Sequence, residues 1–157
     1  AETAEVLGVP IPEVVDGAHK RVAEIKNLRS EISELRRQLA IGQSGELAGK
    51  AVDGVVIERV EGLDRDGVRE LAIAIRDTDG VDAVVLGCAP ESGGVVLVAA
   101  ASAEGPFSAG DLIANAAKHI KGGGGKGADL AIAGGKDAEG LDAALETARQ
   151  AASSVLA

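Results

Sequence analysis

The stretch VDAVVLGCAPESGGVVLVAAA, residues 81–101, decides the fold of this chain. It holds two apolar runs, 81–89 and 94–101, separated by the short turn ESGG. Each run has the length and the β-branched content of a buried strand, and so short a turn joins antiparallel neighbours. We therefore predict a β-hairpin. Cys88, the only cysteine of the chain, falls in the first run and is expected to be a small buried residue in a reducing compartment.

Upstream of the hairpin, a strand pattern is followed by a helix pattern. Residues 51–62, AVDGVVIERVEG, predict a strand. Asp64 has the position of an N-cap for a helix that we expect to end at Gly80. The apolar residues of this helix recur at helical spacing and should face the core: Val68, Leu71, Ala72 and Ile75.

Downstream of the hairpin, Ser108 and Asp111 have a spacing typical of a capping box at the start of a helix. The apolar stripe of that helix is Ile113, Ala116, Ala117 and Ile120. Residues 129–135, DLAIAGG, predict a short buried strand, and Asp137 is expected to cap a last helix. The inward residues of the last helix should be Leu141, Leu145, Ala148 and Val155. The order β-α-β-β-α-β-α predicts an α/β (α+β) fold with helices covering a mixed sheet.

Residues 13–40 predict one long helix, which Pro10 and Pro12 separate from a short helical tail before Gly8. Its apolar residues alternate by three and four, the spacing of a coiled-coil seam. They are Ile25, Leu28, Ile32, Leu35 and Leu39. Such a seam packs on a copy of itself, on another helix of a longer protein, or on the same core, and the pattern leaves these open. Residues 41–50, IGQSGELAGK, predict a loop, so we expect a helical subdomain over 1–42 and a globular subdomain over 43–157.

The net charge of −9 argues against a general coat for nucleic acid. One basic island stands out on this acidic chain, around four consecutive glycines. It consists of Lys118, His119, Lys121, Gly122, Gly123, Gly124, Gly125, Lys126 and Lys136. Glycine is costly to order, so either the loop is filler that ends a helix beside solvated lysines, or a bare backbone is needed there.

The glycine run does not match the known phosphate-binding loops. A G-x-G-x-x-G match through Gly122, Gly124 and Gly127 has a helix before it and a strand after it, which is the reverse of the dinucleotide-binding order. A P-loop would need a hydroxyl residue where Ala128 follows Gly127. One cysteine and two distant histidines make no zinc site, and the chain has no nucleophile elbow. We therefore expect no catalytic residue, no metal and no cofactor.

The chain contains no apolar stretch long enough to span a membrane, and no signal peptide is visible. It begins without methionine, on residues that read as the tail of a helix, so we expect it to be part of a longer protein.

Residues 122–149, GGGGKGADLAIAGGKDAEGLDAALETAR, resemble the C-terminal domain of alanyl-tRNA synthetases, a domain type shared with the DHH-family phosphoesterases. The preceding order is also similar to that family: a coiled-coil-like helix, a linker, a strand and then GVRELA. The family usually has a longer glycine run followed by Arg or Lys and then Pro, whereas Lys126 interrupts the run here and Gly127 and Ala128 follow. Ile132 stands where the family commonly has Gln.

This resemblance implies a non-catalytic domain of an enzyme, alanine–tRNA ligase, that works in the cytoplasm. Its partners would be the alanine-specific tRNA, held at the elbow by the basic island, the preceding catalytic and editing domains, and a second copy bound through the seam. Two other functions stay open on the sequence. One is the substrate-binding half of a DHH-type phosphoesterase, with the glycine loop gripping a phosphate, and the other is a purely structural oligomerisation module.

Overall fold

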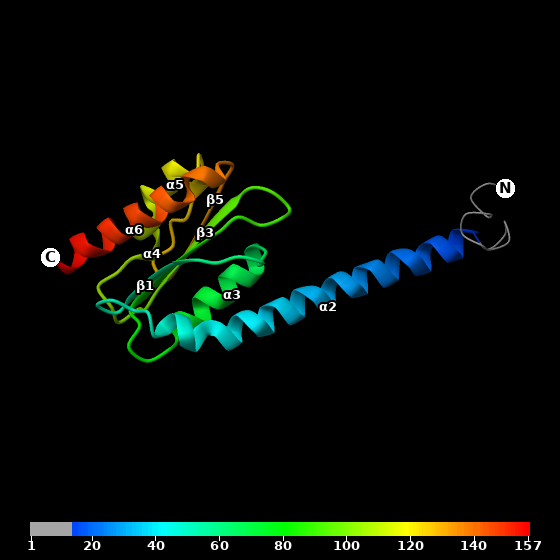
Figure 1. The fold of residues 1–157 in the computed structure, drawn as a ribbon, viewed down its shortest axis with the longest axis horizontal. Helices are drawn as coiled ribbons and strands as arrows, with labels where there is room; N and C mark the ends of the chain where they lie inside the picture. The colour runs from blue at the N-terminus through cyan, green and yellow to red at the C-terminus, as the bar shows by residue number, and fades with distance from the viewer. Residues whose placement is uncertain (1–13) are drawn as a thin grey trace. The chain divides into compact units, whose positions relative to one another are not determined.

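The computed structural model describes residues 14–157 (Figure 1). Helix α2 spans Val14–Ala48 and confirms the long helix, while the helical tail expected before Gly8 lies outside the described residues. The loop expected over 41–50 is wrong, because α2 continues through it to Ala48. Gly42 and Gly45 have open space around them on this helix, and the Ser44 hydroxyl donates to the Ile41 carbonyl at 2.7 Å, so these residues are accommodated without breaking it.

The contacts of the chain divide it between Leu35 and Arg36, inside α2. The subdomain boundary predicted after residue 42 stays a prediction. After α2, the elements along the chain are β1 (Val55–Arg59), α3 (Arg65–Arg76), β2 (Ala83–Cys88), β3 (Val95–Ala101), α4 (Ala109–Ala114), α5 (Ala116–His119), β4 (Gly123–Gly124), β5 (Leu130–Gly135), the 3₁₀ turn η2 (Ala138–Gly140) and α6 (Leu141–Leu156).

The five strands form one mixed sheet in the order β1-β2-β3-β5-β4. Strands β1 and β2 are parallel, and every other pair is antiparallel. The predicted hairpin is confirmed by the pairing of β2 with β3, from Ala83 opposite Ala101 to Cys88 opposite Val96. The mixed α/β fold expected from the order of elements is confirmed.

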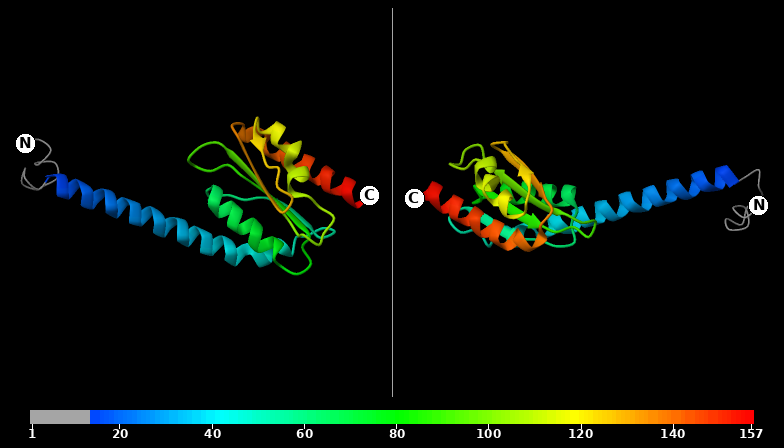
Figure 2. Two further views of the ribbon diagram at one scale, coloured as in Figure 1. Left: turned by 180° about the vertical axis from the view of Figure 1, so that it is seen from behind. Right: turned by 90° about the horizontal axis from the view of Figure 1, so that it is seen from above.

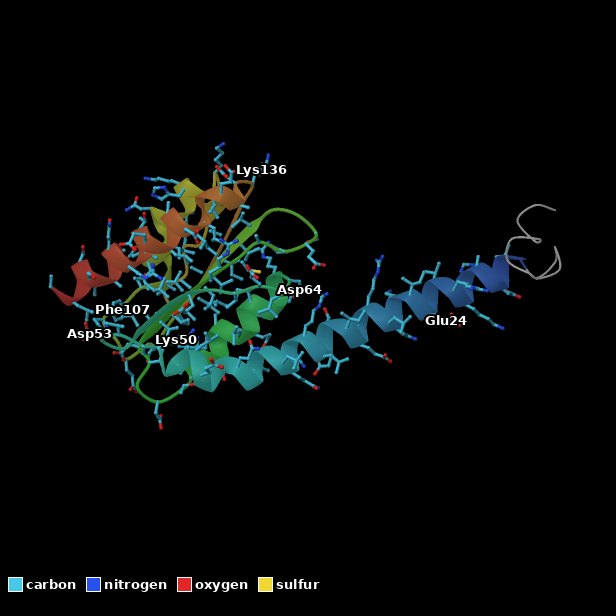
Figure 3. The ribbon with its side chains drawn as sticks, in the orientation of Figure 1. Glu24, Lys50, Asp53, Asp64, Phe107 and Lys136 are labelled. Carbon is cyan, nitrogen blue, oxygen red and sulfur yellow. The ribbon has the colours of Figure 1, made fainter. Side chains whose placement is uncertain are left out.

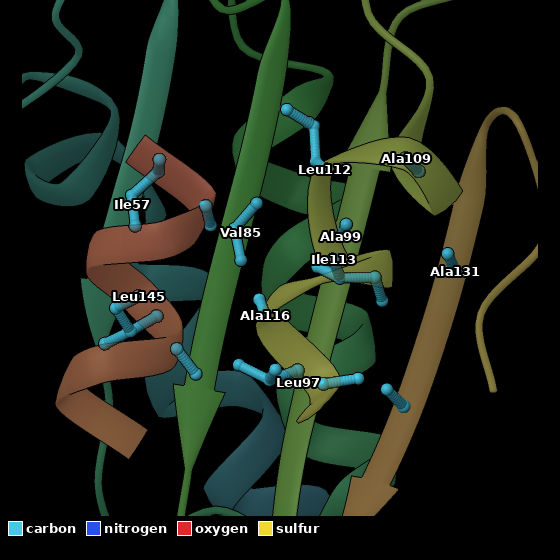
Figure 4. Close-up of a cluster of buried hydrophobic side chains, with 14 of the residues drawn as sticks. Ile57, Val85, Leu97, Ala99, Ala109, Leu112, Ile113, Ala116, Ala131 and Leu145 are labelled. Carbon is cyan, nitrogen blue, oxygen red and sulfur yellow. The ribbon is translucent and has the colours of Figure 1, made fainter. Parts of the chain in front are cut away.

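Helices cover both faces of this sheet, as Figures 1 and 2 show. On one face, α4, α5 and α6 enclose a cluster that includes Val85, Leu97, Ile113 and Leu145 (Figure 4). On the other face, α3 lies against β2 and β3 and encloses a cluster that includes Val84. The alternation of neighbouring strand residues between the two clusters follows from the two-residue period of a strand.

Cys88 is fully buried at the end of β2, as predicted. Its thiol donates to the Leu63 carbonyl at 3.3 Å. Burial raises the pKa of the Cys88 thiol, because the charged thiolate would lose its hydration. The compartment expected from this residue stays a prediction.

Helix α3 begins as the sequence predicts and ends early. The Asp64 carboxylate accepts the Gly67 N–H at 2.8 Å and so caps the helix, and its whole apolar stripe is buried. The helix ends at Arg76 instead of reaching Gly80, which lies in the following turn with φ of +87°. The strand expected over 51–62 is likewise shorter, because Asp53 and Gly54 have positive φ and break it before Val55.

The capping box expected at Ser108 is wrong. The Ser108 side chain makes no capping hydrogen bond at α4. The Ala109 and Gly110 N–H groups donate instead to the carbonyls of Ala128 and Gly127, at 2.8 Å each. The backbone that follows the glycine run thus satisfies the first donors of this helix. The helix itself is two pieces, α4 and α5, although its apolar stripe is buried as predicted.

The last helix begins one turn later than expected. Asp137 caps η2 by accepting the Glu139 N–H at 3.1 Å, and α6 follows from Leu141. Leu141, Leu145 and Ala148 are buried, which confirms most of the inward face. Val155 contradicts the prediction because it is 43% exposed: the buried face of α6 ends at Ala152, one turn before the helix does.

Candidate nucleic-acid interface

The middle of the glycine run, Gly123–Gly124, is a short edge strand and not a loop. Gly123 pairs with Gly134, and Gly124 pairs with Ala133, so β4 extends the sheet beyond β5. Two glycine-containing segments that are separate in the sequence therefore lie side by side. Each glycine of the segment is either required by the fold or leaves the backbone bare for another reason.

Several glycines are required by close backbone packing. A side chain on Gly122 would overlap the Gly134 carbonyl, and one on Gly127 would overlap the Leu130 carbonyl. Gly124 and Gly125 have φ of +118° and +73°, which side chains disfavour. These positions explain most of the run by the fold alone.

Gly123 and Gly134 are the exception within this segment. Both are exposed, neither has positive φ, and a side chain on either would meet nothing within 4 Å. They are directly opposite each other, so their missing side chains leave a bare area on the same face of the sheet. It is the face that α3 covers, because Gly134 pairs with Val96 of the α3-side cluster. Packing does not explain why these two residues are glycine.

The basic side chains at this end of the sheet have few competing partners. Lys121 Nζ lies 3.6 Å from the Asp137 carboxylate, but the lysine side chain is 76% exposed, and such pairs are weak. Lys118 Nζ donates to the Asn115 amide oxygen at 3.1 Å, and His119 Nε2 lies 2.9 Å from the Thr147 hydroxyl. Within the described part of the chain, the side chain of Lys136 makes no hydrogen bond or ion pair (Figure 3).

The end of α5 and the end of β5 are tied together by backbone hydrogen bonds. The N–H groups of Lys136 and Asp137 both donate to the Ile120 carbonyl, at 2.9 and 3.0 Å. This brings Lys121 and Lys136 to the glycines of β4. Lys118 and His119 lie on α5, which covers the opposite face of the sheet from the bare area, and the His119 ring contacts Thr147 of α6. Lys126 is not brought to the same place, because the segment after it returns to the start of α4. We assign the name basic glycine edge to Lys121, Gly123, Gly134 and Lys136.

Lys121 occupies a backbone conformation that usually belongs to glycine. Its φ is +51°, in the left-handed region. The Lys121 N–H donates to the Lys118 carbonyl and the Gly122 N–H donates to the Ala117 carbonyl, at 3.2 and 2.9 Å. This pair of bonds is the Schellman ending of a helix, in which the left-handed residue is most often glycine. A lysine there is strained, and strain that is kept at one position points to a use for the side chain.

Lys121→Gly is expected to raise the free energy of unfolding by about 1 kcal/mol, because glycine adopts the left-handed conformation without strain. Loss of the exposed ion pair between Lys121 and Asp137 offsets only about 0.3 kcal/mol of this gain. Urea denaturation followed by circular dichroism measures the change. Lys118→Gly, inside α5, is the matched control and should lower stability by about 1 kcal/mol. A fall in both variants would contradict strain at Lys121.

Neither the pairing of Lys121 with Asp137 nor strand β4 was predicted from the sequence. A signal for β4 was available in the two glycine segments, each beside a lysine and separated by an apolar strand.

Over residues 14–157, the structure contains no group of three or more His, Cys, Asp or Glu side chains that could hold a metal ion. In the same residues, it contains no helix both long and apolar enough to cross a membrane.

The residues predicted for oligomerisation are solvent-exposed along α2. The exposed fractions of Ile25, Leu28, Ile32, Leu35 and Leu39 run from 49% to 69%. Since an uncovered row of large aliphatic side chains is unfavourable in water, these residues are a second candidate site.

Residues 53–154 match the DHHA1 domain, and the chain belongs to that family. The fold is also similar to a solved structure, the C-Ala domain of alanyl-tRNA synthetase from Aquifex aeolicus. The TM-score is 0.55 at 26% identity, over 62% of this chain and 88% of that one. The resemblance to the C-terminal domain of alanyl-tRNA synthetases is thereby confirmed.

The similar full-length proteins are alanine–tRNA ligases. The enzyme of Anaeromyxobacter dehalogenans is 40% identical over 138 residues, which are 85% of this chain and 15% of that protein. The enzyme of Delftia acidovorans is 36% identical over 151 residues, 92% of this chain and 17% of that protein. The chain thus corresponds to about one sixth of the length of these relatives.

Proposed function

We propose that this domain binds the elbow of alanine-specific tRNA through the basic glycine edge, as an accessory part of an alanine–tRNA ligase. The observation that carries the proposal is the exposed pair Gly123 and Gly134, which no packing requirement explains. It is flanked by Lys121, a lysine whose backbone has the left-handed φ that usually belongs to glycine.

The proposed contact has two parts. The tRNA elbow ends in a flat, stacked base pair, and a strand without side chains can approach such a surface closely. Lysine ammonium groups beside the strand would reach phosphates and position the RNA without reading its sequence. This division suits a chain with one aromatic residue, Phe107, which is buried in the core. Stacking on aromatic side chains, the usual way to hold unpaired bases, is closed to it.

The same proposal covers the remaining partners. The domain would work in the cytoplasm, without a cofactor of its own, beside the catalytic and editing domains of the same enzyme. By holding the outer corner of the tRNA it would help the acceptor end reach both sites. The seam of α2 would join two copies of the protein.

Charge reversal at the basic glycine edge tests the RNA contact. Lys121→Glu combined with Lys136→Glu is expected to weaken tRNA binding about fivefold and to reduce the slope of log K against log salt by about 1.5. Fluorescence anisotropy over a salt series measures both quantities. Lys20→Glu with Lys50→Glu makes the same change in net charge at exposed positions elsewhere and should have a smaller effect. Equal losses in the two double variants would contradict a localised contact.

A further inference from the structure

The uncovered seam of α2 has a regular heptad register. Ile25 and Ile32 take position a, and Leu28 and Leu35 take position d. β-Branched residues at a combined with leucine at d favour two parallel helices over larger assemblies. All four side chains are about half exposed and lie on one unbroken helix. The register by itself suits a two-stranded coil.

The charges beside the seam determine the direction of the second helix. Glu24 and Glu31 fall at position g, and Arg29 and Arg36 fall at position e. In a parallel pair in register, g of one helix faces e of the next heptad on the other helix. Glu24 then faces Arg29 of the second copy. In an antiparallel pair g faces g, which would set glutamate against glutamate.

These four charged residues are available for such contacts. Within the described residues, none of them forms an ion pair or side-chain hydrogen bond inside the chain. Figure 3 labels Glu24 on the exposed length of α2. We propose that α2 pairs with α2 of a second copy of this chain as a parallel coiled coil in register, in which Glu24–Arg29 and Glu31–Arg36 contacts select the direction. This rests on the self-association included in the proposed function.

The seam is short, which sets the expected strength. Position d is occupied by Arg21 before the seam and by Gly42 after it, so the regular part runs only from Ile25 to Leu39. About two heptads give weak, reversible pairing, since stable coils usually need three or four. Arg36 also lines a hollow of the globular part together with Gly62 and Leu63. Glu24 with Arg29 is therefore the cleaner pair for a test.

Cysteine cross-linking tests the direction. In a parallel coil in register, the two copies of residue 28 are adjacent, so Leu28→Cys should give a covalent dimer with oxidised glutathione as the oxidant. Ser30→Cys, at the outward position f, is the matched control and should stay monomeric on a non-reducing gel. The native thiol does not interfere, because Cys88 is fully buried.

Sedimentation of the unmodified chain tests self-association separately from the parallel register. A monomer at the highest attainable concentration would refute self-association and this inference with it. Association of the unmodified chain without cross-linking of Leu28→Cys would refute only the parallel register.

A charge swap tests the selecting contacts. Arg29→Glu converts two symmetric attractions into two repulsions and should weaken association about tenfold. Adding Glu24→Lys restores the attraction in a parallel coil and should recover most of that loss. Failure of the second substitution to restore association would overturn the assignment of this pair.

Discussion

Gly123→Val is expected to weaken tRNA binding about tenfold while leaving the stability of the domain unchanged. The loss of one flat stacking contact corresponds to about 1–3 kcal/mol, and 1.4 kcal/mol is tenfold. The valine would meet no protein atom near its Cβ, and β-branched residues are favoured in strands. Bulk at this position should therefore harm the contact with RNA and not the fold. Fluorescence anisotropy with tRNA, alongside urea denaturation, measures both effects.

Gly45→Val is the matched control for this substitution. Gly45 is also exposed, without positive φ and with open space around its Cβ position, but it lies on α2. The Gly45→Val variant should leave tRNA binding unchanged. Gly134→Val should behave as Gly123→Val does, because the two residues share one face. If Gly123→Val and Gly134→Val both bind tRNA unchanged, the proposed flat stacking contact is wrong, and only the lysines can contribute to binding.

The strands and helices that the sequence predicted correctly have patterns contained within each element. The apolar runs of β2 and β3 and the stripe of α3 behind Asp64 are of this kind. Strand β4 has no such pattern, because two glycines have no side chains to alternate. It exists through its pairing with Gly134 and Ala133, which no local window contains.

The candidate site was predictable in composition and not in arrangement. The charge of the basic island identified its lysines, but the chain folds so that Lys136 joins the end of α5 while Lys126 lies beside the start of α4. That separation depends on the turn between β4 and β5.

The extent of α2 was missed because Gly42 and Gly45 are typical of loops. On an exposed helix face each of these glycines costs only about 1 kcal/mol, so the helix continues through them.

Gly140→Ala is expected to lower the free energy of unfolding by about 3 kcal/mol, the largest effect on stability that we predict. The added Cβ would overlap the carbonyl group of His119, so η2 could no longer approach the end of α5. A backbone carbonyl cannot move aside without displacing the hydrogen bonds around it. Because Lys121 lies in the turn that follows His119, tRNA binding should weaken as well.

Gly87→Ala provides the comparison, since its obstacle is of another kind. There a Cβ would come within 2.6 Å of a terminal methyl of Leu141 and 3.2 Å of one of Leu145. Methyl groups at the ends of side chains can rotate away, so the loss should be about 1 kcal/mol. Gly45→Ala, with nothing to displace, should instead gain about 1 kcal/mol from helix propensity. Thermal unfolding ranks the three variants, and a Gly140→Ala protein as stable as Gly87→Ala would mean that the end of α5 is not fixed by its contact with η2.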